Sequence, residues 1–236
     1  MDFYVQMHLH TSDTSRCGED SARDMIRACK RAGYHLVVVT DHFMNANIRT
    51  SPGMTWPEKV EALMRGYRAG KAEGDKIGIT VLFGWETYTS GPEYLTYGLG
   101  EEFLLKNPGI DRLPPREYLA AIREAGGFIA HAHPYREAYY IPHFELLTRE
   151  IDAVEVFNGG NDDPAWNRRA LALARRADLI EIAGSDAHDV SRVGFGAVRL
   201  PRPVRTMEEL IAILRERKGE VIERMPQALP HGSGTC

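Results

Sequence analysis

Short apolar runs alternate with amphipathic stretches along almost the whole chain, and this alternation limits the fold more than any other sequence feature. Runs such as 37–39 and 80–83 are followed by helix-period segments, which is typical of parallel strands covered by helices. We therefore predict an α/β architecture, either a barrel or a doubly wound sheet. The predicted strands are 4–7, 36–39, 79–83, 94–99, 127–130, 153–157 and 180–183, and the predicted helices are 21–32, 57–73, 116–125, 164–176 and 207–217.

The length and composition fit one large domain. The chain has 236 residues, of which 43% are hydrophobic, and this is enough for a full core. Because no Pro/Gly-rich linker divides it, we predict a single domain over residues 1–225 and a loose C-terminal tail over 226–236. We also expect no membrane segment, since no window approaches the ~18 apolar residues of a span and no signal-peptide pattern opens the chain.

Charge and cysteine content narrow the class of protein further. The net charge of −4 argues against a broad nucleic-acid-binding surface. Cys17, Cys29 and Cys236 form no CxxC pair, so we expect no disulfide framework and a reducing, cytoplasmic location. The oligomeric state is left open.

Two histidines stand one residue apart at the end of the first predicted strand, in the segment FYVQMHLHTSD. Side chains alternate faces along a strand, so His8 and His10 point the same way and can converge on one ion. The sequence holds two His-x-His pairs, whereas composition alone predicts about 0.3. A polar pair at a strand end also has a purely structural interpretation, and only further donors nearby favour a metal site.

Further donors follow the other predicted strands at their carboxyl ends. These ends meet at one edge of a barrel or parallel sheet, where active sites lie. Imidazole and carboxylate together suit Zn²⁺, Mn²⁺ or Fe²⁺. The donors exceed what one ion accepts, so we predict about two to three divalent metals that share a carboxylate and activate a water for hydrolysis. The segments are TDH (40–42), GWE (84–86), HAHP (131–134) and GSDAH (184–188).

The ordered motifs HLHT, TDH, Glu86, AHP and GSDAH resemble those of the PHP (polymerase and histidinol phosphatase) family, from Tyr4 to about Arg199. The resemblance implies a distorted (β/α)7 TIM-like barrel, a trinuclear metal centre at the C-terminal ends of the strands, and phosphoester hydrolysis as the usual activity. It implies three metal positions. The first is bound by His8, His10, Glu86 and Asp186, the second by Glu86 and His133, and the third by His42 with His188.

Two positions of the family pattern are filled differently in this chain. The loop after the first motif reads TSDTSRCGED and offers Asp13 as the ligand of the third metal, with Cys17 and Glu19 as alternatives. On the strand after Glu86, Glu93 stands where many members have a histidine. Glu93 is therefore the further candidate ligand of the second metal.

These residues predict a hydrolase that acts on a small phosphorylated metabolite or a nucleotide. The predicted catalytic residues are Glu86, Asp186 and His188, and the predicted phosphate-binding residues are Arg136 and Arg192, which closely follow ligand motifs. Hydrolysis of a C–N bond is an alternative, because the same activated water can attack a polarised carbonyl. A metal-binding regulatory module without turnover is another.

Overall fold

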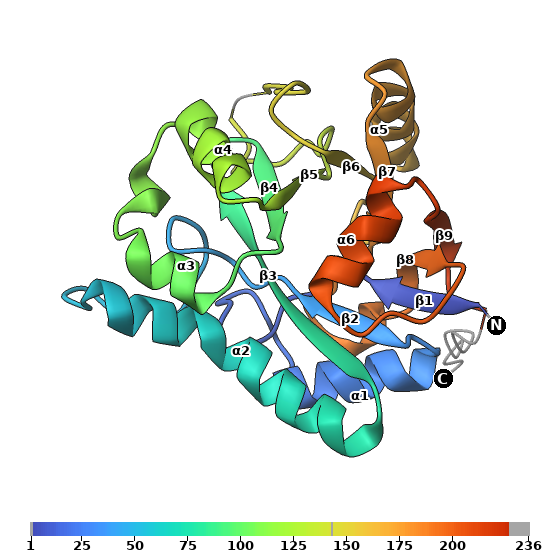
Figure 1. The fold of residues 1–236 in the computed structure, drawn as a ribbon, viewed down its shortest axis with the longest axis horizontal. Helices are drawn as coiled ribbons and strands as arrows, with labels where there is room; N and C mark the ends of the chain where they lie inside the picture. The colour runs from blue at the N-terminus through green and yellow to red at the C-terminus, as the bar shows by residue number, and fades with distance from the viewer. Residues whose placement is uncertain (1, 143, 227–236) are drawn as a thin grey trace, which may run out of the picture.

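The computed structural model describes residues 2–142 and 144–226, and nine strands within this part form one mixed sheet (Figure 1). Their order across the sheet is β7-β6-β5-β4-β3-β2-β1-β8-β9. The tail predicted over 226–236 lies outside the described residues, apart from its first residue. The strands are β1 Phe3–Gln6, β2 Leu36–Val39, β3 Thr80–Tyr88, β4 Glu93–Tyr97, β5 Phe128–Ala132, β6 Ala153–Asn158, β7 Ile180–Gly184, β8 Phe195–Leu200 and β9 Glu220–Arg224.

Strand directions make the sheet a distorted barrel. β1, β2 and β3 are parallel neighbours, and so are β5, β6 and β7. β4 is antiparallel to β3 and β5, while β8 is antiparallel to β1. β7 packs against β8 and β9, and Leu9 forms a parallel bridge with Ala187, so the sheet nearly closes on itself. The predicted α/β barrel is confirmed, and the doubly wound alternative is wrong.

The strands differ in number and length from the prediction. The sequence pattern predicts neither β8 nor β9. Strand β9 reads EVIER and lacks an apolar run, and all five of its residues are exposed or partly exposed. Strand β3 extends to Tyr88, beyond its predicted end at 83, since its second half pairs with β4 instead of β2. Glu86 therefore lies within the strand, not after it.

Helices cover the outside of the barrel, and α1 and α2 lie side by side along one flank (Figure 1). Capping boxes begin α2 and α6, at Thr55 and Thr206, where a glutamate three residues later binds the cap backbone. The short α3 is not predicted from the sequence. The helices are α1 Ala22–Ala32, α2 Trp56–Ile77, α3 Glu101–Lys106, α4 Pro115–Glu124, α5 Pro164–Arg176 and α6 Met207–Arg215.

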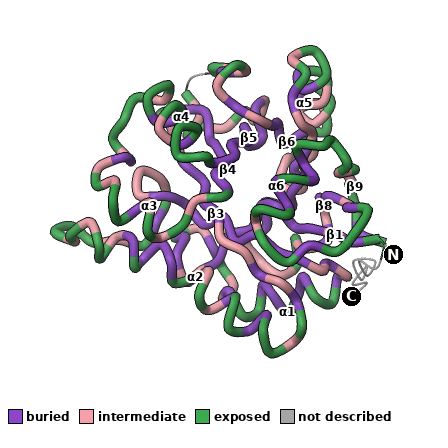
Figure 2. Tube along the Cα trace, in the orientation of Figure 1, coloured by how far each residue is buried: buried purple, intermediate pink, exposed green. Residues whose placement is uncertain are grey.

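Helix α6 closes one end of the barrel. Its Leu210 and Leu214 belong to the same buried cluster as Phe3, Leu36 and Phe128, the first residues of three parallel strands. Figure 2 shows the strands as largely buried and the outward helical faces as exposed. Apolar residues thus fill this end of the barrel. Polar side chains instead line a cavity at the opposite end, where the parallel strands finish.

Candidate metal centre

Eight potential metal ligands meet at this open rim of the barrel. Seven of them come from the ends of parallel strands or directly follow them. Glu93 opens β4, and because β4 is antiparallel, its first residue reaches the same rim. The others are His8 and His10 after β1, His42 after β2, Glu86 near the end of β3, His133 after β5, and Asp186 and His188 after β7.

The carboxylate of Glu86 lies at the centre of these ligands. Its Oε1 is 3.3 Å from Nε2 of His8 and 3.2 Å from Nε2 of His133. Its Oε2 is 3.4 Å from Nε2 of His10 and 3.1 Å from Nδ1 of His42. A carboxylate whose two oxygens face different imidazoles has the geometry to bridge two cations.

Asp186 completes the first group of ligands. Its Oδ1 is 3.3 Å from Nε2 of His8 and 3.2 Å from Nε2 of His10, and these two nitrogens are 3.0 Å apart. All three ligand atoms lie within 4.8 Å of one another. With Glu86 they form a compact set of nitrogen and oxygen donors around one point, which suits a divalent transition metal.

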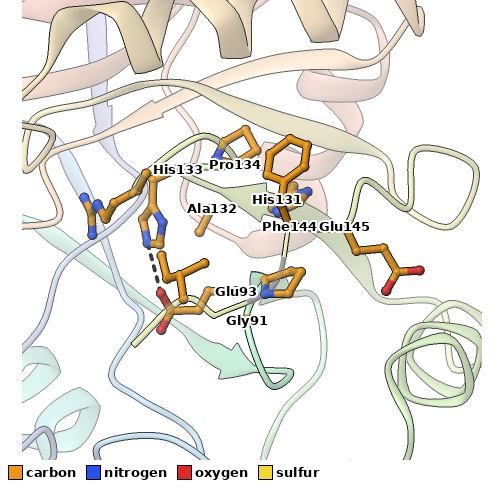
Figure 3. A pocket seen from close by; sticks show the side chains of 11 residues that line it. Gly91, Glu93, His131, Ala132, His133, Pro134, Phe144 and Glu145 are labelled. Carbon is orange, nitrogen blue, oxygen red and sulfur yellow. Dashed lines mark ion pairs between the residues drawn. The ribbon is translucent and has the colours of Figure 1, made fainter. Parts of the chain in front are cut away.

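The second group contains Glu93 and His133. In Figure 3 the His133 ring points toward Glu93, and the dashed line marks their ion pair, 3.5 Å between Nε2 and Oε2. Ligand atoms of His42, Glu86 and Glu93 also lie within 4.8 Å of one another. His131 does not join them, since it packs against Tyr94 with ring centroids 4.8 Å apart.

The third group contains His10, His42 and His188, whose ligand atoms again lie within 4.8 Å of one another. The ring of His10 lies 4.3 Å from that of His42 and 4.4 Å from that of His188, measured between centroids. Nδ1 of His188 is 2.9 Å from the carbonyl oxygen of Asp186. Because the carbonyl can only accept, Nδ1 carries the proton and Nε2 is free to bind a metal.

The loop ligand predicted for this third group lies elsewhere. The carboxylate of Asp13 accepts a hydrogen bond of 2.7 Å from the first backbone N–H of α1, and Glu19 is exposed. Cys17 instead lines the cavity, and its thiol contacts His42 and His188. Burial raises the pKa of this thiol, but the hydrogen bonds with the two histidines outweigh burial and lower it to about 5.

A buried glutamate behind the ligands is not predicted from the sequence. Oε1 of Glu155 is 3.0 Å from Nδ1 of His8, while Oε2 accepts hydrogen bonds from His133 N–H at 3.0 Å and Asn158 Nδ2 at 2.7 Å. The contact fixes a proton on Nδ1 of His8 and leaves Nε2 for a metal. The only signal is one carboxylate within the apolar run AVEVF, because a buried acid needs a partner.

Asp41 acts on the ligands less directly. Its Oδ1 accepts hydrogen bonds from the backbone N–H of Thr11 at 2.7 Å and from the hydroxyl of Ser15 at 2.6 Å. Oγ of Ser15 lies 3.4 Å from Nδ1 of His10. Asp41 therefore orients the first ligand loop and reaches His10 through Ser15.

Two ligand residues have strained backbones. Asp186 has a φ of 50° and His133 a φ of 28°, in the region that only glycine adopts freely. The N–H of Asp186 is held by the carbonyl of His8 at 2.9 Å, and that of His133 by Glu155 at 3.0 Å. Such strain costs about 1–3 kcal/mol and is concentrated at functional sites.

The charges of the rim fit divalent cations. Burial raises the pKa of Glu86 and Asp186, but the neighbouring imidazoles, joined at Asp186 by Arg136, outweigh burial and hold both values well below the ordinary range. Conversely, burial lowers the pKa of His8, but three carboxylates outweigh it and hold the value well above. Burial and the charge of Glu86 raise the pKa of Glu93 to about 8. The cluster therefore needs positive charge, which protons or metals can supply.

Six of the eight candidate ligands line a cavity of about 700 Å³, and the fully buried His8 and His10 are not among its described lining residues. Arg136 lies in its wall, with Nη2 2.7 Å from Oδ2 of Asp186, while Asn158 and Asn161 accept two further hydrogen bonds at 2.9 and 3.0 Å. Arg192 is exposed, donates to a loop carbonyl at 3.4 Å, and is not among the described residues that line the cavity. The structure brings Arg136, and not Arg192, to the candidate centre.

Known proteins share parts of this sequence and fold. Residues 164–218 match a family model described as PHP-associated. The uncharacterized protein MJ1587 of Methanocaldococcus jannaschii is 26% identical over 152 residues, which cover 64% of this chain and 74% of that protein.

Solved structures show the same fold over nearly the whole chain. A two-domain protein from Bacteroides vulgatus containing a predicted PHP-like metal-dependent phosphoesterase is 14% identical, with a TM-score of 0.72 over 95% of this chain and 65% of that one. An amidohydrolase from Chromobacterium violaceum, solved with bound sulfate and no metal, is 14% identical, with a TM-score of 0.58 over 93% of this chain and 97% of that one.

The barrel and its rim of histidines and carboxylates define an α/β barrel protein with a candidate centre for divalent metals. The match of residues 164–218 to a PHP-associated family model and the shared barrel fold support the PHP (polymerase and histidinol phosphatase) family that the ordered motifs predicted. Among the described residues, no helix combines the length and the apolar character that a membrane crossing requires.

Proposed function

We propose that this protein is a metal-dependent phosphoesterase that acts on a small phosphorylated molecule. The observation that carries the proposal is the position of Arg136, whose side chain is only 12% exposed, lines the same cavity as six of the candidate ligands and pairs with Asp186 at 2.7 Å. A phosphate group has more oxygens than the metals can bind, and a guanidinium is shaped to bind two of them in parallel. A neutral amide offers no comparable charge.

The chain's own residues have distinct parts in this reaction. Bound divalent ions supply an activated water and neutralise the charge that develops on the phosphoryl group. Glu86 holds two metal positions together, because each of its oxygens faces different imidazoles. Asp186 faces the first histidine pair with Oδ1 and Arg136 with Oδ2, so it sets the guanidinium at a fixed place beside the metals. His188 lines the cavity with its proton held on Nδ1.

The cavity favours a small substrate. Its volume of about 700 Å³ falls within the ~300–1,000 Å³ that is common for small-molecule sites. Asn45, Tyr88 and Tyr140 also line this cavity. A phosphorylated metabolite or a nucleotide fits such a cavity, with its phosphate at Arg136 and its organic part against these side chains.

Hydrolysis of a C–N bond is the second candidate function. The protein from Chromobacterium violaceum that shares the fold is described as an amidohydrolase and was solved with sulfate. The same ligands would serve that reaction, because an activated water can attack a carbonyl as well as phosphorus.

The test is to reconstitute the protein with Mn²⁺, Fe²⁺ or Zn²⁺ in turn and to assay phosphomonoesters, phosphodiesters and amides. Arg136→Ala is compared with Arg192→Ala, a matched control outside the cavity, and metal content is measured for both. A charge-assisted hydrogen bond contributes about 1.5–3 kcal/mol, so kcat/KM for the phosphoester should fall about 10- to 100-fold in Arg136→Ala. Arg192→Ala should match the parent.

The outcomes separate the candidates. Unchanged phosphoester turnover in Arg136→Ala, at unchanged metal content, removes the phosphate-binding role. Faster turnover of amides than of phosphoesters favours the C–N hydrolase. Turnover of no substrate with any of the three metals favours a binding module without catalysis.

A further inference from the structure

Cys17 lies where a third metal position would need a ligand. Its thiol contacts the rings of His42 and His188, and all three residues line the large cavity. The ligand atoms of these two histidines and of His10 lie within 4.8 Å of one another. The thiol therefore lies beside a group of three imidazoles whose ligand atoms are close enough to share one ion.

Backbone hydrogen bonds of the residues before and after Cys17 hold it at this place. The N–H of Arg16 donates to the carbonyl of Asn47 at 2.8 Å, and the N–H of Glu19 donates to the carbonyl of His188 at 2.8 Å. At Gly18, a Cβ atom would lie 2.4 Å from the backbone carbon of Thr11. Only glycine fits so close an approach, so the loop holds the thiol in a tight turn that is anchored to a candidate ligand.

An unpartnered imidazole nitrogen supplies independent support. His42 is 9% exposed, and its Nδ1 has no hydrogen-bond partner among the described residues, although Oε2 of Glu86 lies 3.1 Å away. A buried nitrogen without a partner is costly unless it binds something. A metal held between His42 and its neighbours would satisfy it.

We infer that Cys17 donates a thiolate to the metal position of His42 and His188, in place of the loop carboxylate expected from the sequence. The inference rests on the proposed metal-dependent function. A sulfur ligand makes this position softer than the other two, whose donors are nitrogen and oxygen only. It therefore takes Zn²⁺, Fe²⁺ or Co²⁺ in preference to Mn²⁺, while the other positions accept Mn²⁺ as well.

Cobalt provides a readout that is independent of activity. The metal-free full chain, with Cys236→Ala to remove the tail thiol, is loaded anaerobically with Co²⁺, and thiolate-to-cobalt charge-transfer absorption in the near ultraviolet is recorded with the cobalt content. We expect the band in this parent, its loss in Cys17→Ser and Cys17→Asp, and its retention in Cys29→Ala, the control thiol buried in an apolar cluster. Cys17→Asp should still bind cobalt and should gain affinity for Mn²⁺.

The possible results separate this inference from the proposed function. Cobalt bound at two or more ions per chain without the band, or a band that survives Cys17→Ser, overturns the thiolate ligand and leaves the metal centre intact. A protein that binds no cobalt overturns both. A band that disappears in Cys29→Ala as well, with the fold retained by circular dichroism, also overturns the assignment to Cys17.

Discussion

The substitution Glu155→Gln tests how the ligand His8 is oriented. Oε2 of Glu155 accepts hydrogen bonds from His133 N–H at 3.0 Å and Asn158 Nδ2 at 2.7 Å, so a glutamine must place its oxygen there. Its NH₂ group then faces Nδ1 of His8, which is 3.0 Å from Oε1 in the parent. Facing a donor, Nδ1 must become the acceptor. The proton of His8 then moves to Nε2, the nitrogen that the metal needs.

The expected magnitude follows from this change of tautomer. Groups that orient a metal ligand typically change metal affinity or activity about 10- to 100-fold when altered, which is about 1.4–2.7 kcal/mol of binding free energy. The two other hydrogen bonds of Glu155 survive, so the effect should fall on metal binding more than on folding. Glu73→Gln is the matched control, because Glu73 is also a buried carboxylate but binds Arg27 Nε at 2.8 Å, away from the rim.

The assay is a titration of the metal-free proteins with Zn²⁺ against a competing chelator, with thermal unfolding as the check of folding. We expect weaker binding in Glu155→Gln and parent-like binding in Glu73→Gln. Parent-like affinity in Glu155→Gln would refute the tautomer argument. Equal losses in the two variants would show that removal of any buried carboxylate loosens the protein.

Two further predictions concern the same rim. Glu86→Gln should weaken two metal positions together and lower activity about 100-fold, whereas Asp13→Asn should leave the metal content unchanged. Analysis of the metal bound per chain checks both predictions. Loss of a single metal position in Glu86→Gln would contradict a bridging role for Glu86. The raised pKa values of His8 and His42 mean that protons occupy these rings in the metal-free protein at neutral pH and must leave when metal binds. Affinity should therefore rise with pH, and calorimetry in buffers of different ionisation enthalpy should detect proton release; its absence contradicts the argument.

The candidate ligands that follow parallel strands were the most predictable part of the site. Motifs such as TDH and GSDAH stand directly after short apolar runs, and the carboxyl ends of parallel strands share one edge. Glu93 reaches that edge for a different reason, which the sequence pattern does not reveal. Its strand is antiparallel, so its first residue, and not its last, lies at the rim.

The loop and the arginines were less predictable. Asp13, Cys17 and Glu19 lie within one short loop, and only the path of that loop decides that Asp13 meets α1 while Cys17 meets His42. Likewise, Arg136 and Arg192 each follow a ligand motif closely, yet one is buried in the cavity wall and the other is exposed. Spacing along the chain does not set the direction of a long side chain.

The sequence by itself determined the α/β class and the order of the main ligand motifs, because these depend on local periodicity and on residues next to strand ends. The tertiary structure alone decided which donors share a position, through the antiparallel β4 and the near closure of the sheet. It also decided that the buried carboxylate of Glu155 lies behind His8, 147 residues away in the chain. Such contacts join strands distant in sequence, and the barrel that brings them together is set by the packing of the whole chain.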